Sequence, residues 1–350
     1  MRRFSAVSVA SLVLATVLAA CSGNGGAEGR EGASGSSSTT VPVASDTTVT
    51  TAPPPTEPPE QGLLEVGAEG ATLHAEPGGA ETGRIRSGVV LPYDAQRDGW
   101  GRVTTPCENR AWVELARGVA RGPVRVVIDP GHGGDEPGAV GPSGLTEAEV
   151  NLDISQRAAR LLHGRGVDAV LTRTGDYRAT LAFRVKTAVD AGAEAFVSVH
   201  HNAEPDEERR TPGSESYFQF RSPESKRLTG LMQEEIFAAF ASYDVVFGAD
   251  FDAGAKWRLG DSGADYYGIL RRSYEAGIPA TLAESAFISN PAEEALLARE
   301  DVRQREAEAI ARALVRYFNG EEPGDVFTEP YPRTAPAGGG GGQQGCVDPA

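Results

Sequence analysis

The sequence predicts an α/β domain, with a mostly parallel sheet and helices on both faces, preceded by a small all-β domain. Between residues 122 and 320, short apolar strand patterns alternate with amphipathic helical patterns. That alternation is typical of βα units and therefore of a parallel sheet covered on both sides. Between residues 62 and 118, short apolar segments are broken by glycines, as in small antiparallel domains.

The α/β region divides into elements by its hydrophobic period. Strands are expected near residues 124–129, 168–173, 194–200, 215–220 and 279–284, where short apolar runs stop at turn residues. Helices are expected near residues 148–163, 178–191, 223–241 and 291–318. The segment 242–265 is rich in Asp and Gly, and we expect it to supply loops.

The amino terminus has the features of a secretory signal. Arg2 and Arg3 precede an apolar stretch that ends at Ala20, which is short for a membrane span of about 20 residues. The stretch ends in LAAC (18–21), which resembles the lipobox of bacterial lipoproteins and implies cleavage after residue 20 and a lipid on Cys21. An ordinary signal peptide with a chance cysteine is the alternative. Residues 21–61 are rich in Ser, Thr, Gly and Pro, and this composition predicts a disordered linker.

Charge and cysteine content limit the partners. The formal net charge of −16 argues against nucleic acid or an anionic membrane surface, so that a membrane anchor would depend on acyl chains. Besides Cys21, the chain has Cys107 and Cys346, and the sequence does not show whether they pair. The tail, residues 321–350, contains TAPAGGGGGQQG and is predicted to be disordered.

The region before the α/β domain has weak motifs of its own. DGWGRV (98–103) and RAWVEL (110–115) resemble segments of bacterial SH3-like domains, so residues 62–118 are expected to form such a domain. Trp100 and Trp112 are either a platform for a ligand or buried residues of the barrel.

Four residues lie at or just after short apolar runs and carry groups suited to catalysis: His132, Glu147, His200 and Glu284. Three of them follow predicted strands, and the carboxyl ends of strands in open parallel sheets supply ligand crevices. Imidazole nitrogen and carboxylate oxygen are usual ligands of zinc, which leaves a fourth position open for water in catalytic sites. Zinc lowers the pKa of that water to about 7 and polarises a carbonyl, as amide hydrolysis requires. A turn or hydrogen-bonding role is the alternative for each histidine alone.

Several motifs in this region occur together and in order. They are IDPGHGGDEPGA (128–139), GLTEAEVNLDIS (144–155), LTRTGDYRATLAFR (171–184), VSVHHNA (197–203) and LAESAFISNPAEEALL (282–297). With them, residues 124–318 resemble the zinc-dependent N-acetylmuramoyl-L-alanine amidases of the bacterial cell wall. The resemblance implies one zinc ion per chain, held by His132, Glu147 and His200, with Glu284 as the catalytic residue.

Two positions leave alternatives for the metal ligands. His201 stands where a small residue is common, but side chains of a strand alternate between faces, so only one of His200 and His201 points to the crevice. The resemblance favours His200. Glu149 is the alternative to Glu147, although it could instead complement the dipole of the following helix. Asp129 and Asn202 are expected just outside the ligands, because ligating histidines usually donate their other N–H to an oxygen.

The resemblance implies a secreted, lipid-anchored amidase of the cell envelope, on the extracytoplasmic side. Its substrate would be peptidoglycan, cut at the amide bond between the lactyl group of N-acetylmuramic acid and L-alanine. Ser285 and Ala286 replace a Thr-Gly pair that is frequent in the family, without removing a ligand. Two alternatives are an envelope-binding lipoprotein whose amidase fold is inactive, and a zinc peptidase that acts on stem peptides.

Overall fold

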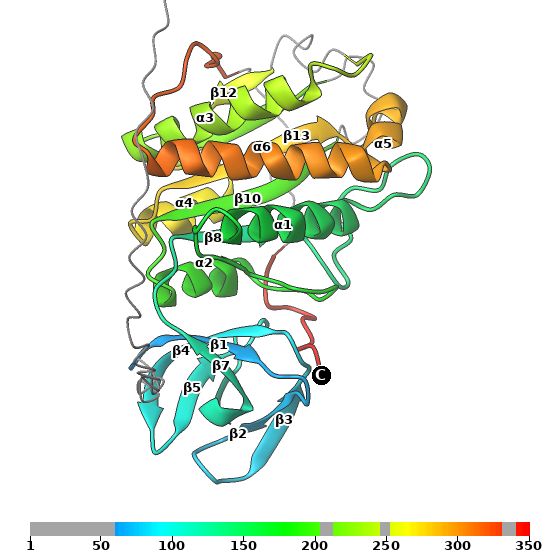
Figure 1. Cartoon of the computed structure of the whole chain (residues 1–350). Coiled ribbons are helices and arrows are strands. Elements are labelled where there is room, and N and C mark those ends of the chain that lie inside the picture. The colour runs from blue at the N-terminus through cyan, green and yellow to red at the C-terminus, as the bar shows by residue number, and fades with distance from the viewer. Residues whose placement is uncertain (1–59, 204–212, 246–252, 331–340) are drawn as a thin grey trace, which may run out of the picture. The chain divides into compact units, whose positions relative to one another are not determined.

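Two β-sheets organise the part of the chain that the computed structural model describes, namely residues 60–203, 213–245, 253–330 and 341–350 (Figure 1). These residues all belong to one compact unit, which spans residues 55–350. The predicted signal peptide and Cys21 lie outside the described residues, as does nearly all of the linker. Among the described helices, none combines the length and the apolar character that crossing a membrane requires.

The first sheet is antiparallel throughout and has seven strands in the order β3-β2-β6-β5-β4-β1-β7. The strands are β1 (Gly62–Val66), β2 (Ala71–His74), β3 (Glu81–Ile85), β4 (Val90–Arg97), β5 (Trp100–Thr104), β6 (Arg110–Glu114) and β7 (Gly118–Arg121), with a short 3₁₀ helix, η1 (Leu115–Arg117), between the last two. Leu64, Leu91, Tyr93, Val103 and Val113 form its fully buried centre. This region is therefore all-β, as predicted, and it extends to Arg121; its SH3-like character stays a prediction.

The second sheet has six strands in the order β12-β11-β13-β10-β8-β9. They are β8 (Val126–Pro130), β9 (Ala169–Leu171), β10 (Ala195–Asn202), β11 (Glu215–Phe218), β12 (Gly254–Lys256) and β13 (Ala280–Phe287). Only the β11–β13 pair is antiparallel among the pairs of this sheet, so the prediction of a mostly parallel sheet is confirmed. Strand β8 is buried along its whole length, which explains the apolar run of residues 126–128.

Helices cover both faces of the second sheet (Figure 1). They are α1 (Glu147–His163), α2 (Leu181–Asp190), α3 (Pro223–Phe240), α4 (Gly268–Glu275), α5 (Pro291–Leu297) and α6 (Glu300–Phe318). Alternate residues of each strand face different helices: Ile128 and Val197 pack with α1, α3 and α6, whereas Val127 and Phe196 pack with α2 and α4. Both faces of these strands are therefore buried, each in its own core, so their sequences read as continuous apolar runs although the side chains alternate between faces.

The structure differs from the predicted elements in three places. The helix expected over residues 291–318 is divided into α5 and α6, and the sequence predicted neither α4 nor the three-residue β12. The tail also differs from the disordered segment that we expected. Cys346 forms a disulfide with Cys107, with 5.5 Å between their Cα atoms, and this bond fixes residues 341–350 against the rest of the chain.

Candidate active site

The turn after β8 places His132 at the carboxyl end of the second sheet. His132 adopts a left-handed backbone conformation with φ of 59°, which is uncommon for a residue with a side chain. The glycine before it is required by packing, because a Cβ atom at Gly131 would lie 2.2 Å from the ring of His200. A Cβ atom at Gly138 would lie 2.5 Å from the carboxylate of Glu147. The glycines of this motif therefore let the turn close around two other side chains.

Glu147 is the first residue of α1, and its carboxylate lies between two histidines. Its oxygens are 3.1 Å from Nε2 of His132 and 2.8 Å from Nδ1 of His200, and the amide of Ala139 donates to one of them at 2.9 Å. Burial by itself would raise the pKa of Glu147, but the hydrogen bonds to both histidines hold it well below its usual value. The buried side chain is therefore a carboxylate, the form that binds a metal ion.

His200 lies on β10 directly beside Glu284 of β13, because the two residues are register partners in the parallel pair. The next residue, His201, is buried on the other face, with its nitrogens 2.9 Å from Asn151 Oδ1 and 3.2 Å from Glu306 Oε2. Burial lowers the pKa of His200, and Glu147 opposes that shift. A neutral imidazole is the form that ligates metals.

The structure thus brings together His132, Glu147 and His200, whose potential ligand atoms lie within 4.8 Å of one another. Two imidazoles and one carboxylate are a donor set that suits zinc. The two alternatives lie elsewhere: His201 faces α6, and Glu149 is exposed, with its carboxylate 3.4 Å from Arg303.

A pocket of about 270 Å³ opens beside these residues. Its lining includes His132, His200 and Glu284, together with the apolar side chains of Leu181 and Ile269. Tyr267, another lining residue, has its pKa raised to about 12 by burial and by the charge of nearby Glu284. Glu284 therefore faces the same space as the histidines without belonging to the three-residue cluster.

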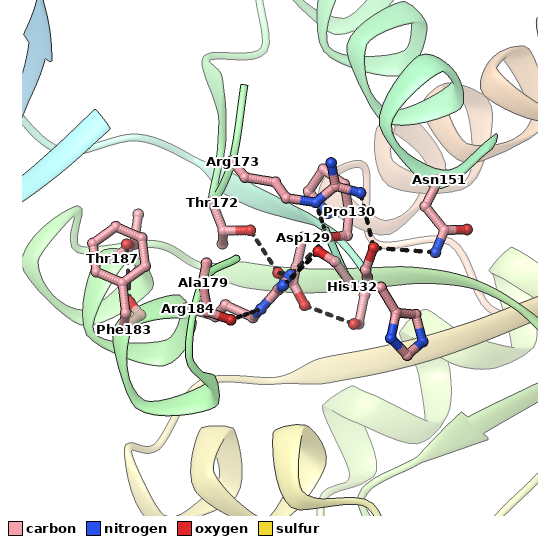
Figure 2. A network of polar contacts seen from close by, with 12 residues as sticks. Asp129, Pro130, His132, Asn151, Thr172, Arg173, Ala179, Phe183, Arg184 and Thr187 are labelled. Atoms are coloured by element: carbon pink, nitrogen blue, oxygen red, sulfur yellow. Dashed lines mark hydrogen bonds and ion pairs between the residues drawn. The ribbon is translucent and has the colours of Figure 1, made fainter. Parts of the chain in front are cut away.

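Asp129, which also lines the pocket, is at the centre of a buried polar network (Figure 2). Its carboxylate accepts hydrogen bonds from Thr172 at 2.5 Å, Ser198 at 2.7 Å and Arg184 at 2.7 Å. The guanidinium of Arg184 also donates to the carbonyl oxygens of Pro130 and His132, at 2.6 and 2.8 Å. Asp129 therefore acts on the His132 turn through Arg184.

A second buried arginine holds the same turn, as Figure 2 shows. Arg173 donates to the carbonyl oxygens of Pro130, Gly131 and Ala148, at 3.0, 2.8 and 2.7 Å. Burial and the neighbouring Arg184 lower the pKa of Arg173 to about 10, so it stays charged at neutral pH. Sequence reasoning missed both arginines as site residues. The available signal was that Arg184 falls on the apolar, buried side of α2.

The two residues expected to contact the ligating histidines have other partners. Asp129 is bonded to Thr172, Ser198 and Arg184, as described, and the amide of Asn202 donates to Glu215 at 3.0 Å. Nε2 of His132 and Nδ1 of His200 contact Glu147, the third proposed ligand.

Comparisons with known proteins show which family this sequence matches. A sequence model of the N-acetylmuramoyl-L-alanine amidase family matches residues 126–316. N-acetylmuramoyl-L-alanine amidase LytC of Bacillus subtilis (strain 168) is 33% identical over 195 residues, which are 55% of this chain and 35% of LytC. The uncharacterized protein YqiI of the same organism is 32% identical over 196 residues, covering 55% of this chain and 84% of YqiI.

Among solved structures, N-acetylmuramoyl-L-alanine amidase AmiC2 of Nostoc punctiforme is 31% identical, with a TM-score of 0.47. That match covers 56% of this chain and 97% of the AmiC2 chain. The sequence match to the family, by contrast, covers more than half of the 350 residues and includes His132, Glu147, His200 and Glu284. The chain therefore belongs to the N-acetylmuramoyl-L-alanine amidase family.

Proposed function

We propose that the protein is a zinc-dependent peptidoglycan amidase that cleaves the bond between the lactyl group of N-acetylmuramic acid and L-alanine. The observation that carries the proposal is the cluster of His132, Glu147 and His200, whose ligand atoms lie within 4.8 Å, beside a pocket that Glu284 also lines. Membership of the family supports the choice of bond, and the relative LytC carries that activity in its name.

The three clustered residues would hold the zinc ion. Their two imidazole nitrogens and one carboxylate oxygen match the ligands of catalytic zinc sites, which keep a further position open. When bound, zinc would polarise the scissile carbonyl and make water a better nucleophile. Hydrogen bonds to the two histidines keep Glu147 deprotonated, and burial favours the neutral form of His200.

Glu284 would move the protons of the reaction. It faces the pocket from β13, next to His200 but outside the ligand cluster. A carboxylate in this position can accept a proton from the attacking water and then deliver it to the leaving nitrogen. The apolar side chains of Leu181, Ile269 and Leu282 line the same pocket and limit competing water.

Replacing Glu284 by glutamine tests this assignment. Glu284→Gln keeps the shape of the side chain but removes the proton acceptor, so turnover of purified sacculi should fall by about 10² to 10⁴-fold. Zinc content, measured by metal analysis, should stay near one equivalent. His200→Ala should lose the metal, and His201→Ala is the matched control that should retain it. Full activity of Glu284→Gln with zinc bound would refute the mechanism.

Product analysis separates the proposal from its alternatives. An amidase releases whole stem peptides with free L-alanine amino termini, which mass analysis of the digest identifies. A peptidase would leave shortened peptides on the glycan, and an inactive binding protein would release neither.

We also propose that Cys21, which lies outside the described residues, carries a lipid that anchors the protein to the membrane. The support is the motif LAAC (18–21) at the end of the apolar stretch. A segment rich in Ser, Thr, Gly and Pro, which is typical of a linker, follows it. Cys21→Ala should move the protein from the membrane fraction to the soluble fraction, whereas Ser22→Ala, the neighbouring control, should not. Unchanged membrane association of Cys21→Ala would contradict the lipid anchor.

A further inference from the structure

The C-terminal segment, residues 341–349, reaches the pocket that contains the proposed catalytic residues. Gly341 lines this pocket together with His132, His200 and Glu284. Its carbonyl oxygen accepts a hydrogen bond from the amide of Leu181, at 3.0 Å, at the start of α2. Its own amide donates to Glu136 Oε1 at 2.9 Å. Main chain from the far end of the sequence is therefore part of the pocket wall.

The rest of the segment is fixed to the protein at several points. Beyond the disulfide between Cys107 and Cys346, the contacts are Arg178 Nη2 to Gly342 O at 2.6 Å, Gln343 Nε2 to Cys107 O at 3.0 Å, Cys107 N to Asp348 Oδ1 at 2.9 Å, Asn109 Nδ2 to Asp348 Oδ2 at 2.7 Å, and Arg86 N to Pro349 O at 2.9 Å. The segment is thus held at the pocket by one end and at the first sheet by the other.

The conformation of Gly341 indicates a close fit. Its φ is +81°, and a Cβ atom there would lie 2.7 Å from Cγ of Leu181. Only glycine combines this backbone conformation with such a close approach without strain. The neighbouring Gly342 has no neighbouring atom within 4 Å of its Cβ position. The close fit of Gly341 and the many contacts of the segment indicate a permanent wall of the pocket. They do not indicate a segment that must move out of the pocket before substrate can bind.

We propose that residues 341–349 form one wall of the substrate-binding pocket and that the Cys107–Cys346 disulfide holds this wall in place. The proposal rests on the amidase function and names a further part of its binding site. Gly341 offers main chain and Leu181 offers an apolar surface, so the wall fits an uncharged part of the glycopeptide. The carboxylate of Glu136 is already engaged by the amide of Gly341 and by Arg178, at 3.0 Å.

Three changes to the full chain test the wall. They are termination after residue 340, the double substitution Cys107→Ser with Cys346→Ser, and Gly341→Ala. Gly122→Ala is the matched control, because Gly122 lies outside the segment and a Cβ atom there would have no neighbouring atom within 4 Å. The measurements are zinc content and the kcat and KM for a soluble glycopeptide that contains the N-acetylmuramoyl-L-alanine bond. We expect each change to raise KM about tenfold, equivalent to about 1.4 kcal/mol of binding, at unchanged zinc content. Gly122→Ala should retain the KM of the unaltered protein.

The other outcomes are distinct. An unchanged KM after termination at residue 340 would overturn the wall, and so would a lower KM, because that result would mean that the segment obstructs the substrate. Loss of zinc from Gly341→Ala would also overturn it, since the segment would then support the His132 turn and not the substrate. If the unaltered protein cleaves no glycopeptide, the amidase proposal itself fails, and this result is separate from any difference among the variants.

Discussion

At the scale of single residues, the buried pair of Asp129 and Arg184 is an energetically costly arrangement in the site. Taking two charges out of water is unfavourable, and the pair is stable only because other partners satisfy the remaining donors and acceptors. Thr172 and Ser198 do so for Asp129, and the carbonyl oxygens of Pro130 and His132 do so for Arg184. Although burial raises the pKa of Asp129, Arg184 and the two hydroxyls lower it below the usual value. The pair therefore stays ionised and fixes the turn that bears His132.

This role of Arg184 predicts an effect on metal affinity. Arg184→Lys keeps the charge, but a single ammonium group cannot bridge Asp129 and two carbonyl oxygens in the planar geometry of guanidinium. The His132 turn should loosen, and the dissociation constant for zinc should rise by about 10 to 100-fold, as is typical for residues that orient ligands. Competition with a coloured zinc chelator measures it. Arg165→Lys, at an exposed position, is the control. Wild-type zinc affinity of Arg184→Lys would show that Arg173 holds the turn alone.

At the scale of elements, the sequence best predicted the strands and helices that have a clear pattern of apolar residues. The apolar runs of β8, β10 and β13 made these strands predictable, together with the site residues near their carboxyl ends. Strand β8 ends two residues before His132, whereas β10 and β13 continue past His200 and Glu284, to Asn202 and Phe287. The alternation of side chains along β10 also limited the choice between His200 and His201. The sequence pattern did not show whether His200 or His201 points to the site, and the family resemblance favoured His200.

The elements that escaped prediction have weak local signals. Helix α4 buries only Ile269, Leu270 and Ser273, and β12 has three residues in a segment rich in Asp and Gly. No glycine or proline marks the break between α5 and α6 at residues 298 and 299. Arg173 and Arg184 escaped for another reason. The position of Arg184 on the buried side of α2 was a signal of burial, but the carbonyl oxygens that the two arginines bind belong to a turn distant in sequence.

At the scale of the whole molecule, the largest surprise is the C-terminal segment, because its partners lie far away in sequence. Cys107 and Cys346 are separated by 239 residues, and composition alone favoured disorder for a tail with five consecutive glycines. The sequence also did not predict the contacts between the first sheet and the α/β region. Leu63 and Val90 of the first sheet belong to the core that includes Val127 and Phe196. Local patterns carry no information about either kind of contact.

Asp94 also joins the two regions, and it predicts how their stability depends on pH. Asp94 lies on β4 and accepts hydrogen bonds from Arg102 at 2.9 Å and Arg110 at 2.9 Å, while Lys186 of α2 approaches to 3.4 Å. Burial acts to raise the pKa of Asp94, but these three cations lower it from 3.8 to about 2. Because the folded pKa is below the unfolded one, the charge stabilises the fold above pH 3.8, and this contribution is lost as the pH falls towards 2.

Asp94→Asn should therefore destabilise the protein near neutral pH, by about 1 to 2 kcal/mol once screening by solvent is allowed for. The difference from the unaltered protein should shrink as the pH falls through the interval between 3.8 and about 2, where Asp94 becomes protonated. Urea unfolding of both proteins at a series of pH values measures this difference. Asp98→Asn, in the exposed turn that follows β4, should change stability little at any pH. A deficit for Asp94→Asn that is constant with pH would assign the loss to hydrogen-bond geometry, and the charge of Asp94 would then not contribute to joining β4 to α2.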